Sequence, residues 1–121
     1  MEGDMIQKAQ DMDLFKMAHS LTLDVYKSTG KFPREERYGL SAQMRRSAYS
    51  IPINVLEGAS RLSKKEYRQF VGIARGSASE ITYQLLLSKD LGYISEGDYT
   101  SLKERYDRVS RMLTGLIKSL Q

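Results

Sequence analysis

Basic side chains are concentrated in the middle of the chain, where they could bind phosphate groups. Residues 31–75 hold ten Lys or Arg and four Asp or Glu, whereas residues 1–30 carry a net charge of −2 and residues 76–121 a net charge of 0. Cationic groups gathered in this way attract polyanions such as nucleic acids. The candidate nucleic-acid-binding residues, which we expect to cluster around the junction of two helices, are Arg45, Arg46, Arg61, Lys64, Lys65, Arg68 and Arg75.

Three tyrosines, Tyr38, Tyr49 and Tyr67, are available to stack on bases beside these cations. The sequence has no RRM, KH or zinc-knuckle pattern. Binding would therefore depend on phosphates and on the shape of the nucleic acid. The alternative interpretation is an ordinary solvated surface that contains several arginines.

Residue types needed for catalysis are scarce. The chain has no cysteine and one histidine, His19, which excludes a Cys/His pair and a multi-histidine metal site within one chain. Glu57 and Glu80 could form a carboxylate pair, but nearby arginines favour salt-bridge or capping roles. His19 lies beside apolar helical positions, where we expect a partly buried structural residue. We predict no catalytic residue, metal or cofactor, and a protein that is not an enzyme.

Four amphipathic segments must position these groups. Stripes of helical period lie within residues 13–30, 40–58 and 63–91, and a fourth consists of Tyr99, Leu102, Tyr106, Val109, Leu113, Leu116 and Leu120. Short connections favour antiparallel neighbours, so the sequence predicts an all-α fold, an antiparallel up-down-up-down four-helix bundle over residues 13–121. Residues 1–12 are polar without a strong period and are predicted to form a flexible N-terminal segment.

Local signals place the ends of these helices. Asp13 is a candidate N-cap, and Pro33 can begin a short helical turn. Residues 63–66 (SKKE) have the spacing of a capping box, and Gly92 is placed to end the third helix in the left-handed conformation. Pro52 lies inside the second helix and should kink it by removing a backbone hydrogen bond.

The second helix has a further apolar face, which indicates self-association. This face holds Tyr49, Ile53 and Leu56, with Pro52 beside them. The third helix carries Gly72 and Gly76 one turn apart, where glycine costs about 1 kcal/mol relative to alanine. We expect close helix approach there, within the bundle or between subunits. The predicted oligomer interface is Tyr49, Pro52, Ile53, Leu56, Gly72 and Gly76, and the alternative for the second apolar face is a wide core-facing arc or a loop folded over this patch.

Length and composition indicate one domain and an intracellular setting. A chain of 121 residues can bury a core without disulfides or metals. The absence of cysteine favours a reducing compartment. No basic leader followed by an apolar run is present, and no apolar stretch approaches the roughly 18 residues of a membrane span. We expect a soluble cytoplasmic protein with no membrane partner.

Six short segments occur in an order and spacing that resemble a known family. They are residues 38–40 (YGL), 43–48 (QMRRSA), 50–58 (SIPINVLEG), 63–66 (SKKE), 73–77 (IARGS) and 91–94 (LGYI). Together they resemble the bacterial four-helix-bundle family of S23 ribosomal, or 23S rRNA intervening-sequence, proteins, over about Leu14 to Leu120. The sequence departs from the family pattern at Val55-Leu56, where Ile-Ala is commoner.

The resemblance implies a homopentamer and a genetic or physical association with 23S ribosomal RNA. It also suggests kinship with the accessory variability proteins of diversity-generating retroelements, which are similar bundles that bind a reverse transcriptase and nucleic acid. The leading hypothesis is a non-enzymatic oligomeric bundle that binds structured RNA or another nucleic acid. The alternative is a protein-interaction scaffold, such as an accessory subunit that recruits a reverse transcriptase or another protein partner.

Overall fold

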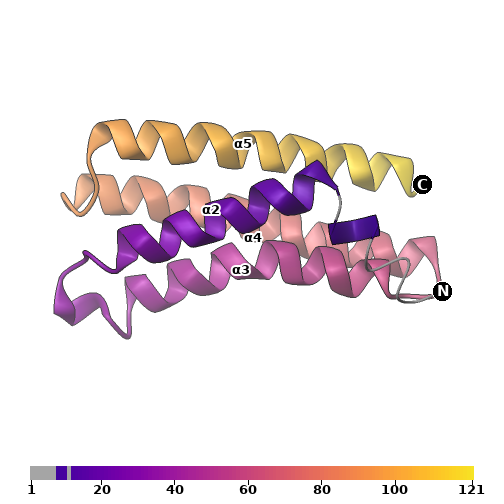
Figure 1. Ribbon diagram of the computed structural model, residues 1–121, viewed down its shortest axis with the longest axis horizontal. Helices are drawn as coiled ribbons and strands as arrows, with labels where there is room; N and C mark the ends of the chain where they lie inside the picture. The colour runs from indigo at the N-terminus through magenta and orange to yellow at the C-terminus, as the bar shows by residue number, and fades with distance from the viewer. Residues whose placement is uncertain (1–7, 11) are drawn as a thin grey trace.

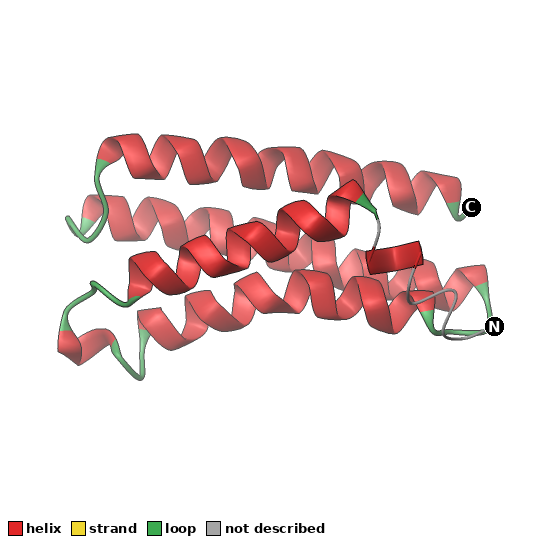
Figure 2. Ribbon diagram, in the orientation of Figure 1, coloured by secondary structure: helices red, strands yellow, loops and turns green. Residues whose placement is uncertain are grey.

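Four long helices make up most of the described chain. The computed structural model describes residues 8–10 and 12–121. The long helices are α2 (Asp13–Thr29), α3 (Leu40–Ala59), α4 (Lys64–Asp90) and α5 (Glu96–Ser119), and a short 3₁₀ helix, η1 (Arg34–Glu36), joins α2 to α3. Figure 1 shows the long helices running lengthwise with alternating direction, and Figure 2 shows helices and loops with no strand in the described residues. The predicted antiparallel four-helix bundle is confirmed.

The predicted flexible segment over residues 1–12 falls largely outside the described residues. Within it, residues 8–10 are helical and the Ala9 side chain is buried, with 2% of its surface exposed.

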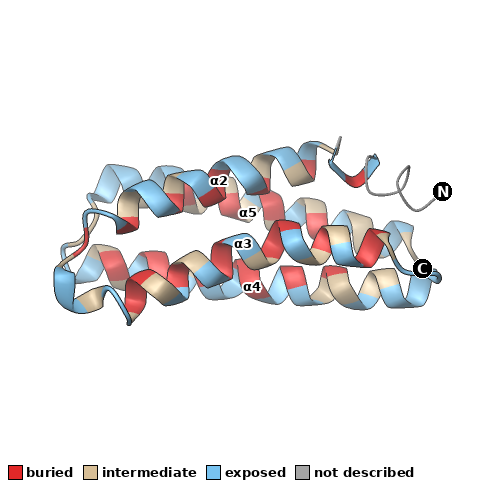
Figure 3. Ribbon diagram, turned by 60° about the horizontal axis from the view of Figure 1, so that its bottom comes forward, coloured by how far each residue is buried: buried red, intermediate tan, exposed pale blue. Residues whose placement is uncertain are grey.

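The apolar stripes of the four helices meet in one core along the bundle axis. α3 packs against α2 and α4, and α5 packs against α4 and α2. Buried positions recur along one side of each helix (Figure 3). The largest fully buried side chains include Leu21 of α2, Met44 and Ile51 of α3, Ile81 of α4, and Tyr106 of α5. Burial of these stripes supplies the main stabilisation of the helices.

The helix ends follow most of the sequence signals. Ser63 accepts a hydrogen bond from the Glu66 amide at 3.1 Å, and Ser95 caps α5 by accepting from the Asp98 amide at 3.0 Å. Gly92 has φ of +81°, and the Tyr93 amide donates to the Ser88 carbonyl at 2.8 Å, which closes α4 in a Schellman arrangement.

One expectation about a helix end needs revision. Asp13 is not the N-cap of α2, because Met12 holds that position and Asp13 is the first helical residue, where its carboxylate favours the positive end of the helix dipole. Pro52 lies inside α3 as predicted, and the helix continues through it from Leu40 to Ala59. The kink expected at Pro52 stays a prediction.

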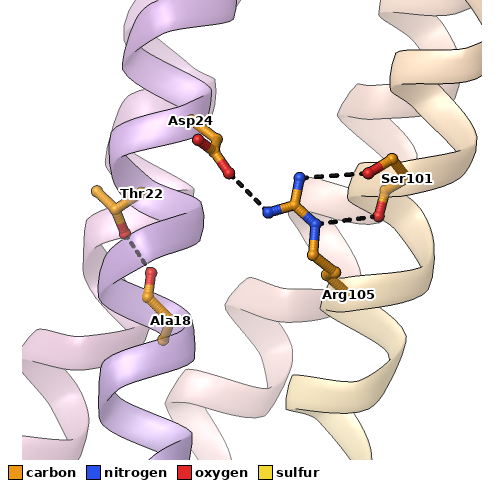
Figure 4. A network of polar contacts seen from close by, with 5 residues as sticks. All are labelled: Ala18, Thr22, Asp24, Ser101 and Arg105. Atoms are coloured by element: carbon orange, nitrogen blue, oxygen red, sulfur yellow. Dashed lines mark hydrogen bonds and ion pairs between the residues drawn. The ribbon is translucent and has the colours of Figure 1, made fainter.

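A polar contact joins α2 to α5 outside the core. Nη1 of Arg105 donates to Oδ2 of Asp24 at 2.7 Å, and the same guanidinium contacts the carbonyl and hydroxyl oxygens of Ser101, each at 3.4 Å (Figure 4). Both charged side chains are about 40% exposed. Thr22 Oγ1 donates to the carbonyl of Ala18 within α2 at 2.7 Å. The partly exposed ion pair between Arg105 and Asp24 contributes modestly to stability, about 1 kcal/mol or less.

Candidate nucleic-acid interface

The structure divides the seven predicted cations into separate groups. Arg61 and Arg68 lie with Lys64 and Lys65 around the connection from α3 to α4, whereas Arg45 and Arg46 lie near the start of α3. Arg45 and Arg61 are sixteen residues apart, which corresponds to about 24 Å along an α-helix. The expectation of one cluster around the helix junction is therefore corrected, because α3 carries Arg45 and Arg46 toward the opposite end of the bundle.

We call Arg61, Lys64, Lys65 and Arg68 the turn cluster. Arg61 pairs with Glu57 at 3.3 Å, and its guanidinium carbon lies 4.6 Å from the centre of the Phe70 ring. Nη1 of Arg68 donates to the Leu120 carbonyl at 2.9 Å. Both lysines are exposed. Two of the four cations are thus held in place and two extend into solvent.

A close contact at Gly58 brings α3 and α4 together beside the turn cluster. A Cβ atom at Gly58 would lie 2.7 Å from Cδ1 of Tyr67. Tyr67 is half-buried against the core, and burial raises the pKa of its phenol. Tyr67 is therefore poorly placed for the predicted stacking on bases, whereas Tyr38 is 86% exposed and Tyr49 is 39% exposed. From the sequence, Gly58 is predicted only as the last residue of the second helix, residues 40–58, and its packing role was not predicted.

The other end of α3 faces an arginine-lined pocket that the sequence analysis did not predict. Arg45 lines it together with Arg34 and Arg37, which come from η1 and the residue that follows it. Arg34 and Arg37 contribute to the excess positive charge of residues 31–75. That charge is the sequence feature that could have indicated them as binding residues. Their convergence with Arg45 depends on how η1 connects α2 to α3.

Arg46 of α3 and Arg75 of α4 lie on different sides of the bundle, the first beside α4 and the second beside α5. Arg46 is exposed and shares a polar groove between α3 and α4 with Glu80, Ser50 and Ser77. Ser77 Oγ donates to Ser50 Oγ at 2.9 Å across that groove. On the α5 side, Arg75 Nη1 donates to Thr114 Oγ1 at 3.4 Å. The structure does not join Arg75 to the turn cluster.

The predicted oligomer residues differ in exposure. Pro52 is buried and Leu56 is half-buried against the core. Ile53 remains 48% exposed, and on α4 Ile73 is 54% exposed and Tyr83 is 63% exposed. Ile73 and Tyr83 were not predicted at the interface, because the predicted second apolar face lies on α3 and both residues lie on α4.

The paired glycines of α4 do not mediate close packing inside the subunit. A Cβ atom at Gly72 or Gly76 would meet nothing within 4 Å. Of the two expected reasons for these glycines, close approach within the bundle is excluded. Approach between subunits stays a prediction.

Residues with catalytic or metal-binding potential are dispersed. No group of three or more His, Cys, Asp or Glu capable of holding a metal occurs in the described part of the chain. His19 is exposed and stacks on Phe15 with ring centres 6.3 Å apart, so the expectation of partial burial is wrong. Glu57 forms the ion pair expected of it. Among residues 8–10 and 12–121, no helix is both long and apolar enough to cross a membrane.

Comparisons with known proteins identify relatives of this bundle. A family model described as 23S rRNA-intervening sequence protein matches residues 10–115. A solved structure of a protein with unknown function from the S23 ribosomal protein family of Bacteroides thetaiotaomicron is similar in fold, with a TM-score of 0.80 and 23% sequence identity. The similarity covers 87% of this chain and 95% of that one. No curated protein matches the sequence.

Proposed function

The chain belongs to the family of 23S rRNA-intervening sequence proteins, and from this premise we propose that it is a non-enzymatic, oligomeric helical bundle that binds RNA. The contacts are made by the turn cluster and by the arginines at the start of α3. The family description names 23S rRNA, which makes structured ribosomal RNA the first ligand to test.

The observation that supports RNA binding most strongly is that most of the predicted cations have no carboxylate partner. Within the described residues, Arg61 pairs with Glu57, and the other six predicted cations form no ion pair. Cations that serve as a solvated structural surface are commonly interspersed with acidic partners. Cations left without such partners can neutralise phosphates and release the counterions bound to them.

The spacing of the cationic groups favours a ligand longer than a single nucleotide. The turn cluster and the arginines at the start of α3 lie about 24 Å apart along this 20-residue helix. That distance spans several phosphates of a nucleic-acid strand, which are about 3.4 Å apart along each strand of a DNA duplex. An RNA stem lying along α3 can therefore contact both ends, and recognition of this kind reads phosphates and shape.

The test is a titration of a labelled 23S rRNA fragment followed by fluorescence anisotropy at low salt. Lys64→Glu/Lys65→Glu should weaken binding at least tenfold, because two attractive contacts become repulsive. Arg108→Glu/Arg111→Glu is the matched control, since both arginines are exposed on α5 and lie outside the turn cluster. No binding by the wild-type protein, or equal weakening by both variants, would refute a localised RNA-binding surface.

Oligomerisation is the second part of the proposal. The exposed Ile53, Ile73 and Tyr83 side chains, together with the open positions at Gly72 and Gly76, support a contact between subunits on the outer surface of α3 and α4. The predicted assembly is a homopentamer. Light scattering should give five times the 13.8 kDa subunit mass, and Ile73→Asp should lower it while helix content stays the same.

The same exposed apolar residues also favour the alternative function, a scaffold that recruits a protein such as a reverse transcriptase. The two functions differ in their response to charge reversal. If Lys64→Glu/Lys65→Glu abolishes RNA binding and leaves the oligomer intact, RNA binding is supported. If a purified reverse transcriptase binds equally well to both charge variants, while RNA is not bound by the wild type, the scaffold is supported.

A further inference from the structure

An arginine-lined pocket lies where α2, η1 and α3 meet. Its volume is about 370 Å³, and we call it the junction pocket. No carboxylate contributes to its lining, which consists of Thr29, Gly30, Phe32, Pro33, Arg34, Arg37, Ser41 and Arg45. The three arginines that line one hollow carry like charges, and a bound anion would offset the repulsion between them.

Arg45 is fixed in position before any ligand arrives. Its Nε donates to Thr29 Oγ1 at 2.9 Å and its Nη2 donates to the Tyr26 carbonyl at 3.2 Å. The guanidinium carbon lies 4.5 Å from the centre of the Tyr26 ring. Its Nη1 makes no hydrogen bond with the described residues. An arginine held in this way retains donors for a phosphate and loses little conformational entropy on binding.

The start of α3 adds one hydroxyl to the same pocket. Its first turn contains no acidic residue, and its first amide, that of Leu40, donates to Glu36 Oε1 at 3.3 Å. Ser41 lines the pocket and is only 6% exposed. Its hydroxyl makes no hydrogen bond with the described residues and is free to donate to an anion bound in the pocket.

The carboxylates of Glu35 and Glu36 lie outside the pocket lining. Glu36 Oε1 accepts from the Leu40 amide at 3.3 Å, and its Oε2 accepts from the Tyr93 hydroxyl at 2.9 Å. These contacts hold Glu36 against the connection between α4 and α5. Glu35 is exposed, and neither glutamate belongs to the pocket lining.

We propose that the junction pocket binds a phosphomonoester dianion, the 5′ phosphate at the end of an RNA strand. Three cations without a carboxylate match the dianion better than the single charge of an internal phosphodiester. Tyr38, 86% exposed, follows Arg37 and lies under its guanidinium at 5.4 Å, which leaves the other ring face for the terminal base. Assignment of the phosphate to RNA rests on the proposed function, whereas the anion site rests on the pocket.

The test compares two RNA oligonucleotides of one sequence, one with a 5′ phosphate and one with a 5′ hydroxyl, by fluorescence anisotropy. The wild-type protein should bind the phosphorylated RNA about tenfold more tightly. Arg34→Ala/Arg37→Ala should remove this preference. Both arginines are exposed, so the fold should persist, and Arg34→Lys/Arg37→Lys should recover part of the preference. Arg108→Ala/Arg111→Ala should retain it in full.

A calorimetric titration with adenosine 5′-monophosphate and with adenosine separates this inference from RNA binding as a whole. Binding of the nucleotide but not the nucleoside supports the anion pocket even if RNA does not bind, and that result would refute the proposed function alone. Equal affinity for the two RNAs, together with no heat from the nucleotide, would overturn the junction-pocket proposal while leaving RNA binding intact. A preference that survives in Arg34→Ala/Arg37→Ala would also overturn it.

Discussion

Replacing Gly58 with alanine tests the packing that brings α3 and α4 together at the turn cluster. The new Cβ atom would lie 2.7 Å from Tyr67 Cδ1, 3.0 Å from Phe70 Cβ and 3.1 Å from the Tyr67 carbonyl oxygen. The last two atoms cannot move away by side-chain rotation, so the helices must separate. Overpacking of this kind costs about 1–3 kcal/mol. The helical preference for alanine recovers at most about 1 kcal/mol. Because two of the three close contacts cannot be relieved by rotation, we expect a cost in the upper part of the overpacking range, which leaves a net destabilisation of about 1–2 kcal/mol.

Thermal and urea unfolding followed by circular dichroism will measure this loss. A change of 1–2 kcal/mol lowers the Tm of a domain of this size by roughly 4–10 °C. Gly115→Ala in α5 is the matched control, because its Cβ would meet nothing within 4 Å and the residue lies outside the proposed oligomer interface, and it should stabilise the subunit by about 0.5–1 kcal/mol. All variants are compared at one subunit concentration, since assembly changes Tm. A Gly58→Ala variant at least as stable as the wild type would refute the reasoning.

Arg105→Ala should cost about 0.5–1 kcal/mol in urea unfolding, because it removes the 2.7 Å contact with Asp24, and the loss should shrink in high salt. An unchanged stability at low salt would show that the contact contributes nothing. Tyr106→Phe should be neutral or stabilising by up to about 1 kcal/mol, because the Tyr106 hydroxyl is buried with no hydrogen-bond partner in the described residues. Burial also raises the pKa of Tyr106 above that of the unfolded chain, so its contribution to stability is present below about pH 10 and declines as pH rises. Unfolding free energies between pH 9 and 11 should fall less steeply for Tyr106→Phe, and parallel slopes would contradict this.

The helices could be predicted from the sequence because each stripe repeats at the helical period. Val109 and Leu113, for example, are both buried in the core at the positions that the pattern requires. The serine caps at Ser63 and Ser95 are equally local signals, since donor and acceptor lie three residues apart. Asp13 failed as an N-cap because helix ends shift by a residue without changing the periodic pattern.

The roles of the glycines could not be predicted from sequence. Gly58, Gly72 and Gly76 all lie inside helices, and the cost of glycine there is similar at each position. Only the path of the neighbouring helix shows that Gly58 faces Tyr67 while the other two face open space. The sequence shows that a glycine inside a helix carries a cost in stability, but the gain that compensates for this cost depends on tertiary packing.

The cationic surface could be predicted in composition but not in layout. Arg45 and Arg61 belong to one basic segment, yet most of the length of α3 separates them. Conversely, Arg34 and Arg45 line one pocket because η1 folds the chain back at the end of α2. Net charge per segment carries no information about which side chains meet in space, and this explains both the incorrect single cluster and the missed pocket.

The salt dependence of RNA affinity tests the central claim most directly. If the cations neutralise phosphates, log K for a 23S rRNA fragment should fall linearly with log salt concentration, and Lys64→Ala/Lys65→Ala should make the slope shallower by roughly 1–2. Arg108→Ala/Arg111→Ala should leave the slope unchanged. Affinity that is independent of salt, or slopes that are identical in all three proteins, would contradict RNA binding through the turn cluster.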